Sequence, residues 1–164
     1  MSKSERIRIM IVEDHFVVRM GLTAIINSQP DMVTVAEAEN GLQAAELFEQ
    51  HQPDVTLMDL RLPGLNGIEA IAAIIEKYPR ARIIVLSTYG GTEDIFRALQ
   101  AGARGYFLKD VKGQELINAI RAVYAGQRPI PAEVASRLAE RIPCSELSPR
   151  EMEILKLIAK GMLN

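Results

Sequence analysis

Carboxylates follow two short apolar runs of the sequence. Glu13 and Asp14 come directly after residues 7–12, and Asp59 comes directly after residues 55–58. If both runs are neighbouring strands of a parallel sheet, the three acidic side chains meet at one edge, because such strands end together. Three like charges within about 5 Å repel by about 3 kcal/mol per pair at an effective dielectric near 20. The cluster therefore predicts a compensating cation, and Mg²⁺ is the expected one because it is a hard ion that prefers oxygen ligands.

A lysine and a hydroxyl pair follow two further runs. Lys109 comes after one of them, and Ser87 and Thr88 come at the end of the other. Lys109 could offset one carboxylate with or without a metal. Together these residues indicate phosphoryl transfer, with Asp59 as the nucleophile that forms an acyl phosphate. Lys109 would pair with the phosphoryl group as a point charge. Ser87 is preferred over Thr88 as the hydroxyl donor because it directly ends its run.

Each of these residues also has a purely structural interpretation. Asp14 could cap a helix that starts at His15, and Ser87 could cap another helix. Asp59 could be a turn residue, and Lys109 could lie along the surface with its stem covered. His15 is expected in a loop or cap position. The combination of these side chains at four strand ends of one frame favours the chemical interpretation.

The elements that must position these side chains alternate regularly along the chain. Five short apolar, β-branched runs are expected to be strands, at residues 7–12, 33–38, 55–58, 83–86 and 106–108. A segment with apolar residues at helical spacing follows each run, and the first is marked by Phe16, Met20, Ile25 and Ile26. Five strand–helix units in series predict an α/β fold, a doubly wound (βα)5 parallel sheet with helices on both faces.

Composition limits the remaining possibilities. The chain has 164 residues, is 48% hydrophobic and has a net charge of −2. Its single cysteine, Cys144, excludes an intramolecular disulfide framework and favours a reducing, cytoplasmic setting. No secretory signal is expected at the start of the chain, and no segment approaches the roughly 20 apolar residues that a membrane span needs. The sequence contains no basic patch that would predict nucleic-acid binding by charge alone.

The pattern of the sequence changes after Ala125. Residues 126–131 form a turn-rich linker, and Pro131 could open a short helix whose apolar residues are Val134, Leu138 and Ile142. Ser148, Pro149 and Glu151 then form a strong helix start, with a capping box, and Gly161 is the expected stop. The predicted division is a domain over residues 5–125, a linker with a short helix over 126–146, and a helical fragment over 147–164.

Four segments carry a resemblance to a known family. They are Ile11-Val12-Glu13-Asp14-His15, Leu57-Met58-Asp59-Leu60-Arg61-Leu62-Pro63-Gly64-Leu65-Asn66-Gly67, Val85-Leu86-Ser87-Thr88 and Gly102-Ala103-Arg104-Gly105-Tyr106-Phe107-Leu108-Lys109. Over residues 7–125 the chain resembles the receiver domain of two-component response regulators, which has a flavodoxin-like fold. Asp110 follows the lysine where many receivers have proline, so a cis peptide bond is not expected there.

The resemblance implies a role for each matching residue. It implies Asp59 as phosphoacceptor, Lys109 as the phosphate-sensing lysine, and Ser87 with Tyr106 as switch residues. It implies a Mg²⁺ site made by Glu13, Asp14, Asp59 and the backbone carbonyl of Arg61. A sensor histidine kinase is the implied partner. Homodimerisation on phosphorylation is also implied, and no membrane association is expected.

The C-terminal segment supports one subfamily. Leu147-Ser148-Pro149-Arg150-Glu151-Met152-Glu153-Ile154-Leu155, followed by Ala159-Lys160-Gly161, resembles the start of a LuxR-type helix-turn-helix domain of the NarL/FixJ group. The recognition helix that would enter the major groove is absent, so we expect a truncated chain. DNA is an expected partner of the full-length protein and not of this chain.

Three alternatives compete with this interpretation. A phosphatase of the haloacid-dehalogenase type needs a second acid two positions after the nucleophile, where this chain has Arg61. A nucleotide or flavin binder needs a glycine-rich loop after the first strand, where Glu13 and Asp14 would repel a bare phosphate. A receiver-like interaction module that never carries phosphate is the remaining alternative. A receiver is not a conventional enzyme, because it catalyses only its own phosphorylation and dephosphorylation.

Overall fold

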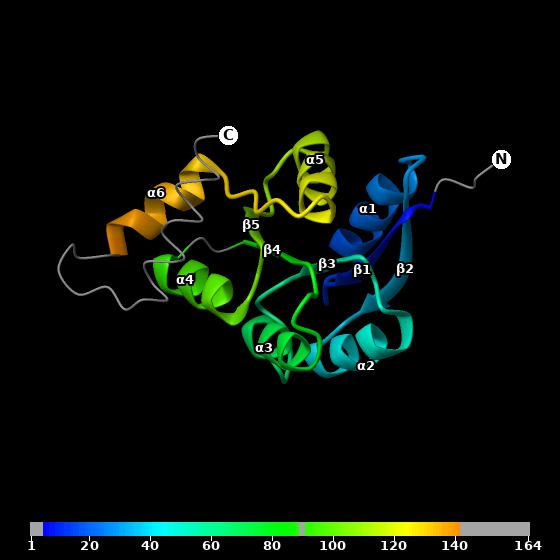
Figure 1. Ribbon diagram of the computed structural model, residues 1–164, viewed down its shortest axis with the longest axis horizontal. Helices are drawn as coiled ribbons and strands as arrows, with labels where there is room; N and C mark the ends of the chain where they lie inside the picture. Colours follow the sequence, from blue (N-terminus) through cyan, green and yellow to red (C-terminus); the bar gives the residue numbers. More distant parts are fainter. Residues whose placement is uncertain (1–4, 89–90, 142–164) are drawn as a thin grey trace.

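The computed structural model describes residues 5–88 and 91–141, and it contains one five-stranded parallel sheet. The strand order is β2-β1-β3-β4-β5, and a helix follows each strand (Figure 1). The strands are β1 (Ile7–Val12), β2 (Met32–Ala38), β3 (Val55–Met58), β4 (Ile83–Ser87) and β5 (Gly105–Leu108). The helices are α1 (Phe16–Asn27), α2 (Gly41–His51), α3 (Gly67–Lys77), α4 (Thr92–Ala101), α5 (Gly113–Tyr124) and α6 (Ala132–Arg141). The predicted doubly wound, flavodoxin-like sheet is confirmed, and each predicted strand is correct to within one residue.

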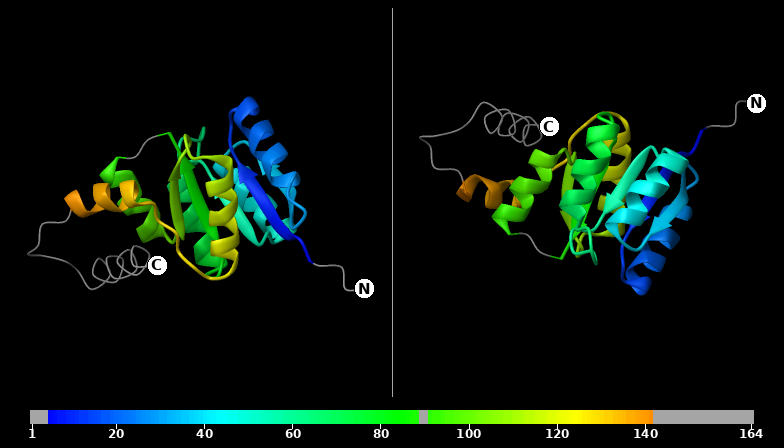
Figure 2. Two further views of the ribbon diagram at one scale, coloured as in Figure 1. Left: turned by 90° about the horizontal axis from the view of Figure 1, so that it is seen from above. Right: turned by 90° about the horizontal axis from the view of Figure 1, so that it is seen from below.

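Helices cover both faces of the sheet. α1 and α5 lie on one face, and α2, α3 and α4 lie on the other (Figures 1 and 2). Alternate strand residues therefore enter different cores: Ile9 and Ile11 pack with α1 and α5, whereas Met10 and Val12 pack with the helices of the opposite face. This explains the continuous apolar runs, because a strand buried on both faces has no polar side.

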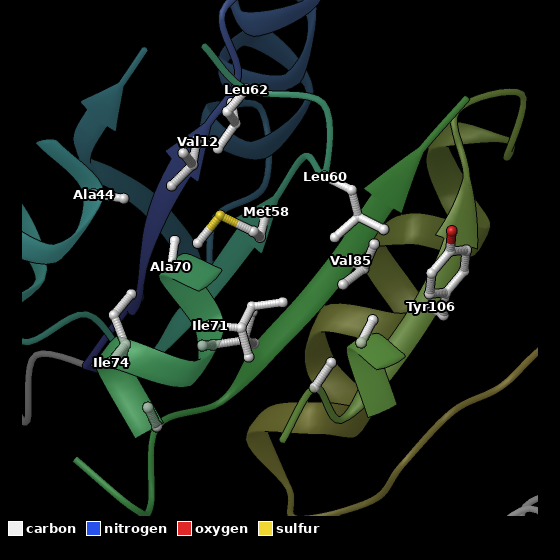
Figure 3. Packing of buried hydrophobic residues seen from close by; sticks show 14 of the residues in the cluster. Val12, Ala44, Met58, Leu60, Leu62, Ala70, Ile71, Ile74, Val85 and Tyr106 are labelled. Atoms are coloured by element: carbon white, nitrogen blue, oxygen red, sulfur yellow. The ribbon is translucent and has the colours of Figure 1, made fainter. Parts of the chain in front are cut away.

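The central strands are the most completely covered. Every residue of β3 and β4 is buried. In Figure 3, Ile71 and Ile74 of α3 lie in the same cluster as Met58 of β3 and Val85 of β4. A strand that ends in this rigid core fixes the first residue beyond it, so the loops at the carboxyl edge begin from well-determined positions.

Helix α1 differs from the expectation in the face that it buries. Phe16 and Met20, which mark the helical spacing, are 63% and 55% exposed, and Ile25 is also exposed. The buried residues are Leu22 and Ile26. The helix has apolar side chains around most of its circumference, so spacing alone allowed more than one buried stripe, and packing against β1 and β2 selected this one.

The short helix expected after Pro131 is present as α6. Figures 1 and 2 show it beside α4, and Val134, Ala135 and Leu138 of α6 are buried in the same cluster as Ile95 and Phe96 of α4. Ile142 and the predicted helix-turn-helix start at 147–164 lie outside the described residues. The domain boundaries therefore stay predictions. None of the helices in the described part of the chain is long and apolar enough to cross a lipid bilayer.

Candidate phosphoacceptor site

Two neighbouring strands bring two buried carboxylates together. β1 pairs with β3 in a register that places Val12 beside Met58, so the next residues, Glu13 and Asp59, stand at the same edge. The Asp59 N–H donates to the Val12 carbonyl at 3.0 Å, which extends the ladder by one residue. Glu13 and Asp59 are only 1% and 2% exposed. Asp14 is exposed, and one oxygen from each carboxylate and a ring nitrogen of His15 all lie within 4.8 Å of one another.

Lys109 reaches this cluster from the end of β5. Its backbone N–H donates to the Ser87 carbonyl at 2.9 Å, which continues the pairing of β5 with β4. Its Nζ atom lies 2.6 Å from Glu13 Oε2 and 3.1 Å from Asp59 Oδ2. The side chain is 13% exposed. Lys109 is therefore an internal counter-ion, and the interpretation of Lys109 as a surface lysine is wrong.

Burial and neighbouring charged groups together shift the pKa values of the two buried carboxylates in opposite directions. Burial raises the pKa of Asp59, and the negative charge of Glu13 adds to the increase, although Lys109 opposes both effects. Burial would also raise the pKa of Glu13, but the hydrogen bonds from Lys109 and His15 outweigh it and hold that pKa below its ordinary value. Perturbed groups that share a cleft are typical of functional sites.

His15 contributes more than the sequence indicated. It is the N-cap residue of α1, which agrees with the expected loop or cap position. Its Nδ1–H donates to Glu13 Oε1 at 2.8 Å. These contacts with Glu13, together with the charge of Asp14, raise the pKa of His15. Asp14 does not cap the helix, because α1 begins at Phe16. The sequence signal for His15 was its place directly after the acidic pair.

The loop after Asp59 is fixed by the start of α3. The Asp59 Oδ1 atom accepts the Arg61 N–H at 3.2 Å, so the expected turn contact of Asp59 coexists with its place in the cluster. Asn66 and Glu69 form a capping box at the start of α3. Gly67 lies so close to the loop that a Cβ atom there would collide with the Asp59 carbonyl oxygen and with Leu60. This close approach requires glycine.

Ser87 and Tyr106 lie together beside the cluster. Both are buried, at 1% and 0% exposed. The Ser87 side chain is hydrogen-bonded to Tyr106, and burial raises the pKa of the Tyr106 hydroxyl to about 12 despite this bond. Thr88 instead lines an open pocket of about 650 Å³, together with His15, Asp59, Arg61 and Lys109. Ser87 caps no helix, because α4 begins at Thr92 with Gly91 as its N-cap. The backbone in the described residues contains no cis peptide bond.

The chain is similar to known proteins of one family. Residues 9–121 match the family described as "Response regulator receiver domain". The nitrate/nitrite response regulator protein NarL of Escherichia coli K12 is 39% identical, with 100% of this chain and 80% of NarL covered. The oxygen regulatory protein NreC of Staphylococcus carnosus is 40% identical, with 96% of this chain and 79% of NreC covered.

A solved structure agrees with the sequence comparisons. The crystal structure of a two-component response regulator of the LuxR family from Aurantimonas sp. SI85-9A1 superimposes with a TM-score of 0.79 at 38% identity, covering 83% of this chain and 97% of that one. The acidic cluster of Glu13, Asp14 and Asp59 resembles the metal site of receivers. The chain belongs to the two-component response regulators, with a receiver domain of the type found in NarL and other LuxR-family regulators.

Proposed function

We propose that Asp59 accepts a phosphoryl group from a sensor histidine kinase, with Mg²⁺ bound beside it, and that the acyl phosphate switches the conformation of the receiver. The observation that carries this proposal is the contact of Lys109 Nζ with Glu13 and Asp59, because Lys109 and Asp59 also line an open pocket. A structural ion pair needs no access to solvent, whereas a phosphoacceptor does.

The residues of the chain supply the parts of the transfer. A carboxylate oxygen of Asp59 attacks phosphorus, and the new O–P bond forms as the P–N bond to the kinase imidazole breaks and that imidazole leaves with the electron pair. Lys109 can stabilise the negative charge of the phosphoryl group, because its ammonium already contacts Asp59 and can pair with a phosphoryl oxygen. Glu13 stays ionised because its pKa is held low.

The donor set fits Mg²⁺. Glu13, Asp14 and Asp59 offer carboxylate oxygens within 4.8 Å of one another, and oxygen is the ligand that Mg²⁺ prefers. The backbone carbonyl of Arg61 is the proposed further ligand. When bound, the cation neutralises charge on the carboxylates and on the phosphoryl oxygens.

Ser87 and Tyr106 are the proposed switch. Ser87 is hydrogen-bonded to Tyr106 in the structure, so a Ser87 hydroxyl drawn toward a phosphoryl oxygen would give up that bond. Tyr106 packs in the same cluster as Leu138 of α6 and Phe96 of α4, so its rearrangement would alter the surface formed by α4, β5 and α5. Thr88 lines the pocket and is the competing hydroxyl.

The output is proposed from the relatives. Residues 126–146 would be the linker and 147–164 the first part of a LuxR-type helix-turn-helix domain. The full-length protein would then regulate transcription in the cytoplasm by binding DNA, and would dimerise on phosphorylation. The LuxR-family name of the Aurantimonas regulator and the regulatory names of NarL and NreC support this assignment.

Intact-mass spectrometry after incubation with acetyl phosphate and Mg²⁺ tests the proposal. We expect a gain of one phosphoryl group, about 80 Da for HPO₃ on a carboxylate, that depends on Mg²⁺ and is absent in Asp59→Asn. Asp54→Asn is the matched control, because Asp54 lies just before the other end of β3 and accepts the Arg8 N–H there. No gain in the folded wild-type chain would favour an interaction module that never carries phosphate.

The two hydroxyl candidates need a separate comparison. If Ser87 serves the phosphoryl group, Ser87→Ala slows phosphorylation and abolishes the response of the Tyr106 NMR signals to phosphate, whereas Thr88→Ala leaves the rate and that response nearly unchanged. The reverse result would assign the hydroxyl to Thr88, and a Tyr106 side chain in one orientation with and without phosphate would contradict the switch.

A further inference from the structure

His15 is held beside the acidic cluster by its backbone. Its own N–H donates to Glu13 Oε1 at 3.0 Å, and its carbonyl accepts the Arg19 N–H at 3.0 Å in the first turn of α1. The ring nitrogen Nδ1 lies 2.8 Å from Glu13 Oε1 and 3.1 Å from Asp14 Oδ1. A fixed helix start therefore directs one imidazole nitrogen at the two carboxylates that are expected to bind a cation.

These separations match those between ligands of one ion. Two adjacent ligands of an octahedral ion lie about 3 Å apart when each is about 2.1 Å from the metal. The distances of 2.8 and 3.1 Å from Nδ1 to the two carboxylate oxygens are of that size. The whole set of atoms spans no more than 4.8 Å, against about 4.2 Å for opposite corners of an octahedron, so movements of about half an ångström suffice.

The two oxygens of Glu13 are already divided between different partners. Lys109 Nζ contacts Oε2, whereas Oε1 faces Nδ1 of His15. A cation that binds Oε1 therefore leaves the lysine contact intact. The His15 side chain is 66% exposed, so the ring can make a small adjustment.

We infer that His15 is a nitrogen ligand of the cation held by Glu13, Asp14 and Asp59, and that it makes the site favour a first-row transition-metal dication such as Mn²⁺ over Mg²⁺. On binding, the Nδ1 proton passes to solvent and Nε2 bears the one ring proton, so a neutral imidazole offers its Nδ1 lone pair to the ion in place of the hydrogen bond to Glu13. Imidazole binds transition metals well, whereas Mg²⁺ prefers oxygen ligands. The inference rests on the cation site of the proposed function and assigns its metal preference.

Binding of Mn²⁺ alone to the untagged chain tests this inference. The chain has two histidines, so His15→Gln removes the proposed ligand and His51→Gln, at the end of α2, is the matched control. The loss of the free Mn²⁺ signal in electron paramagnetic resonance gives the affinity, and competition with Mg²⁺ gives the preference. Pulsed spectra of the bound ion report a directly bonded nitrogen.

We expect nitrogen modulation from wild type and from His51→Gln, and none from His15→Gln. His15→Gln should lose about tenfold or more in Mn²⁺ affinity, since changing even a partner of a metal ligand typically costs that much, and should keep its Mg²⁺ affinity within about twofold because Mg²⁺ prefers oxygen. No nitrogen modulation in wild type, or an unchanged ratio of the two affinities in His15→Gln, overturns the inference.

Phosphorylation of the same variants separates this inference from the proposed function. If wild type accepts phosphate with Mg²⁺ but its bound Mn²⁺ shows no nitrogen, the phosphoacceptor proposal stands and the role of His15 fails. If the Mn²⁺ spectrum shows nitrogen but Asp59 accepts no phosphate, the cation site stands as inferred and the phosphoacceptor proposal fails.

Discussion

The Nζ atom of Lys109 lies 3.1 Å from Asp59 Oδ2, although 50 residues separate them in the sequence. The same ammonium lies 2.6 Å from Glu13 Oε2. One cation thus serves two buried carboxylates, and the pKa of Asp59 remains raised despite it. The site therefore carries uncompensated negative charge until a further cation or a proton binds. The effect of this charge on the stability of the fold can be measured.

Asp59→Asn should stabilise the fold when no divalent cation is present. A raised pKa means that the folded state favours protonated Asp59, so the contribution of Asp59 to stability is fully present below its unfolded pKa and is lost as pH rises through the folded pKa. At neutral pH the ionised carboxylate is therefore a cost, which asparagine removes. We expect the thermal midpoint in EDTA to rise by about 3 °C or more, as roughly 1 kcal/mol gives in a domain of this size. An unchanged or lower midpoint by circular dichroism would contradict this account.

Lys109→Met should have the opposite effect. It keeps most of the apolar stem but leaves Glu13 and Asp59 without their shared counter-ion. We expect a loss of about 3 kcal/mol in the free energy of unfolding, as for a buried pair that loses one partner. Urea titration of the variant and of Lys112→Met, whose lysine is the exposed residue before α5, makes the comparison. Equal losses in the two variants would show that Lys109 is not an internal counter-ion.

The Tyr106 hydroxyl should make stability depend on alkaline pH. Its pKa is raised to about 12 from the ordinary 10.0, so its contribution is fully present below pH 10 and is lost as pH rises toward about 12. Urea unfolding at several pH values across that range should show a steeper decline in the free energy of unfolding for wild type than for Tyr106→Phe. The difference isolates Tyr106, because other alkaline titrations are common to both proteins. Parallel curves would mean that the hydroxyl is accessible.

Two glycine substitutions should change stability in opposite directions. Gly67→Ala places a methyl group against the Asp59 carbonyl and Leu60, so we expect a loss of about 3 kcal/mol from overpacking, together with impaired phosphorylation. Gly21→Ala meets nothing within 4 Å in the exposed middle of α1, so it should gain about 0.5 to 1 kcal/mol from helix propensity. Denaturant titrations measure both, and a neutral Gly67→Ala would contradict the described loop.

The contact between α6 and α4 should open locally when a buried side chain of α6 is shortened. Leu138 is fully buried at that contact, so Leu138→Ala should raise amide exchange across residues 132–141 by tenfold or more, which corresponds to roughly 1.4 kcal/mol of local stability. Protection in α3 should be unaffected. Ser136→Ala, on the exposed side of the same helix, is the control. Hydrogen exchange with mass spectrometry measures both, and an unchanged rate in Leu138→Ala would mean that α6 is held by other contacts.

The sequence was most informative where burial leaves few choices. The strands were predicted to within one residue because a strand covered on both faces is apolar throughout, and their shared carboxyl edge follows from parallel pairing. That rule placed Glu13, Asp59 and Lys109 at one edge, where the structure brings them together. Their chemical roles stay proposals.

Other features depend on three-dimensional packing that no local pattern contains. The exposure of Phe16 follows from which stripe of α1 meets the sheet. The need for glycine at position 67 follows from the return of α3 to the Asp59 loop. The contact of His15 with Glu13 depends on the orientation of its ring, which the sequence does not specify. Each is set by residues distant from the local pattern or by a rotamer, so spacing could not predict it.

The position of Lys109 on the last strand has a consequence for protein synthesis. A nascent chain exposes Asp59 before it contains its lysine partner, and at 5 to 20 residues per second the ribosome needs roughly 3 to 10 s to add the intervening 50 residues. We therefore expect an unfinished chain to be unable to accept phosphate, so that a kinase phosphorylates only completed receivers. A purified chain ending before Gly105 that took up a phosphoryl group from acetyl phosphate would refute this.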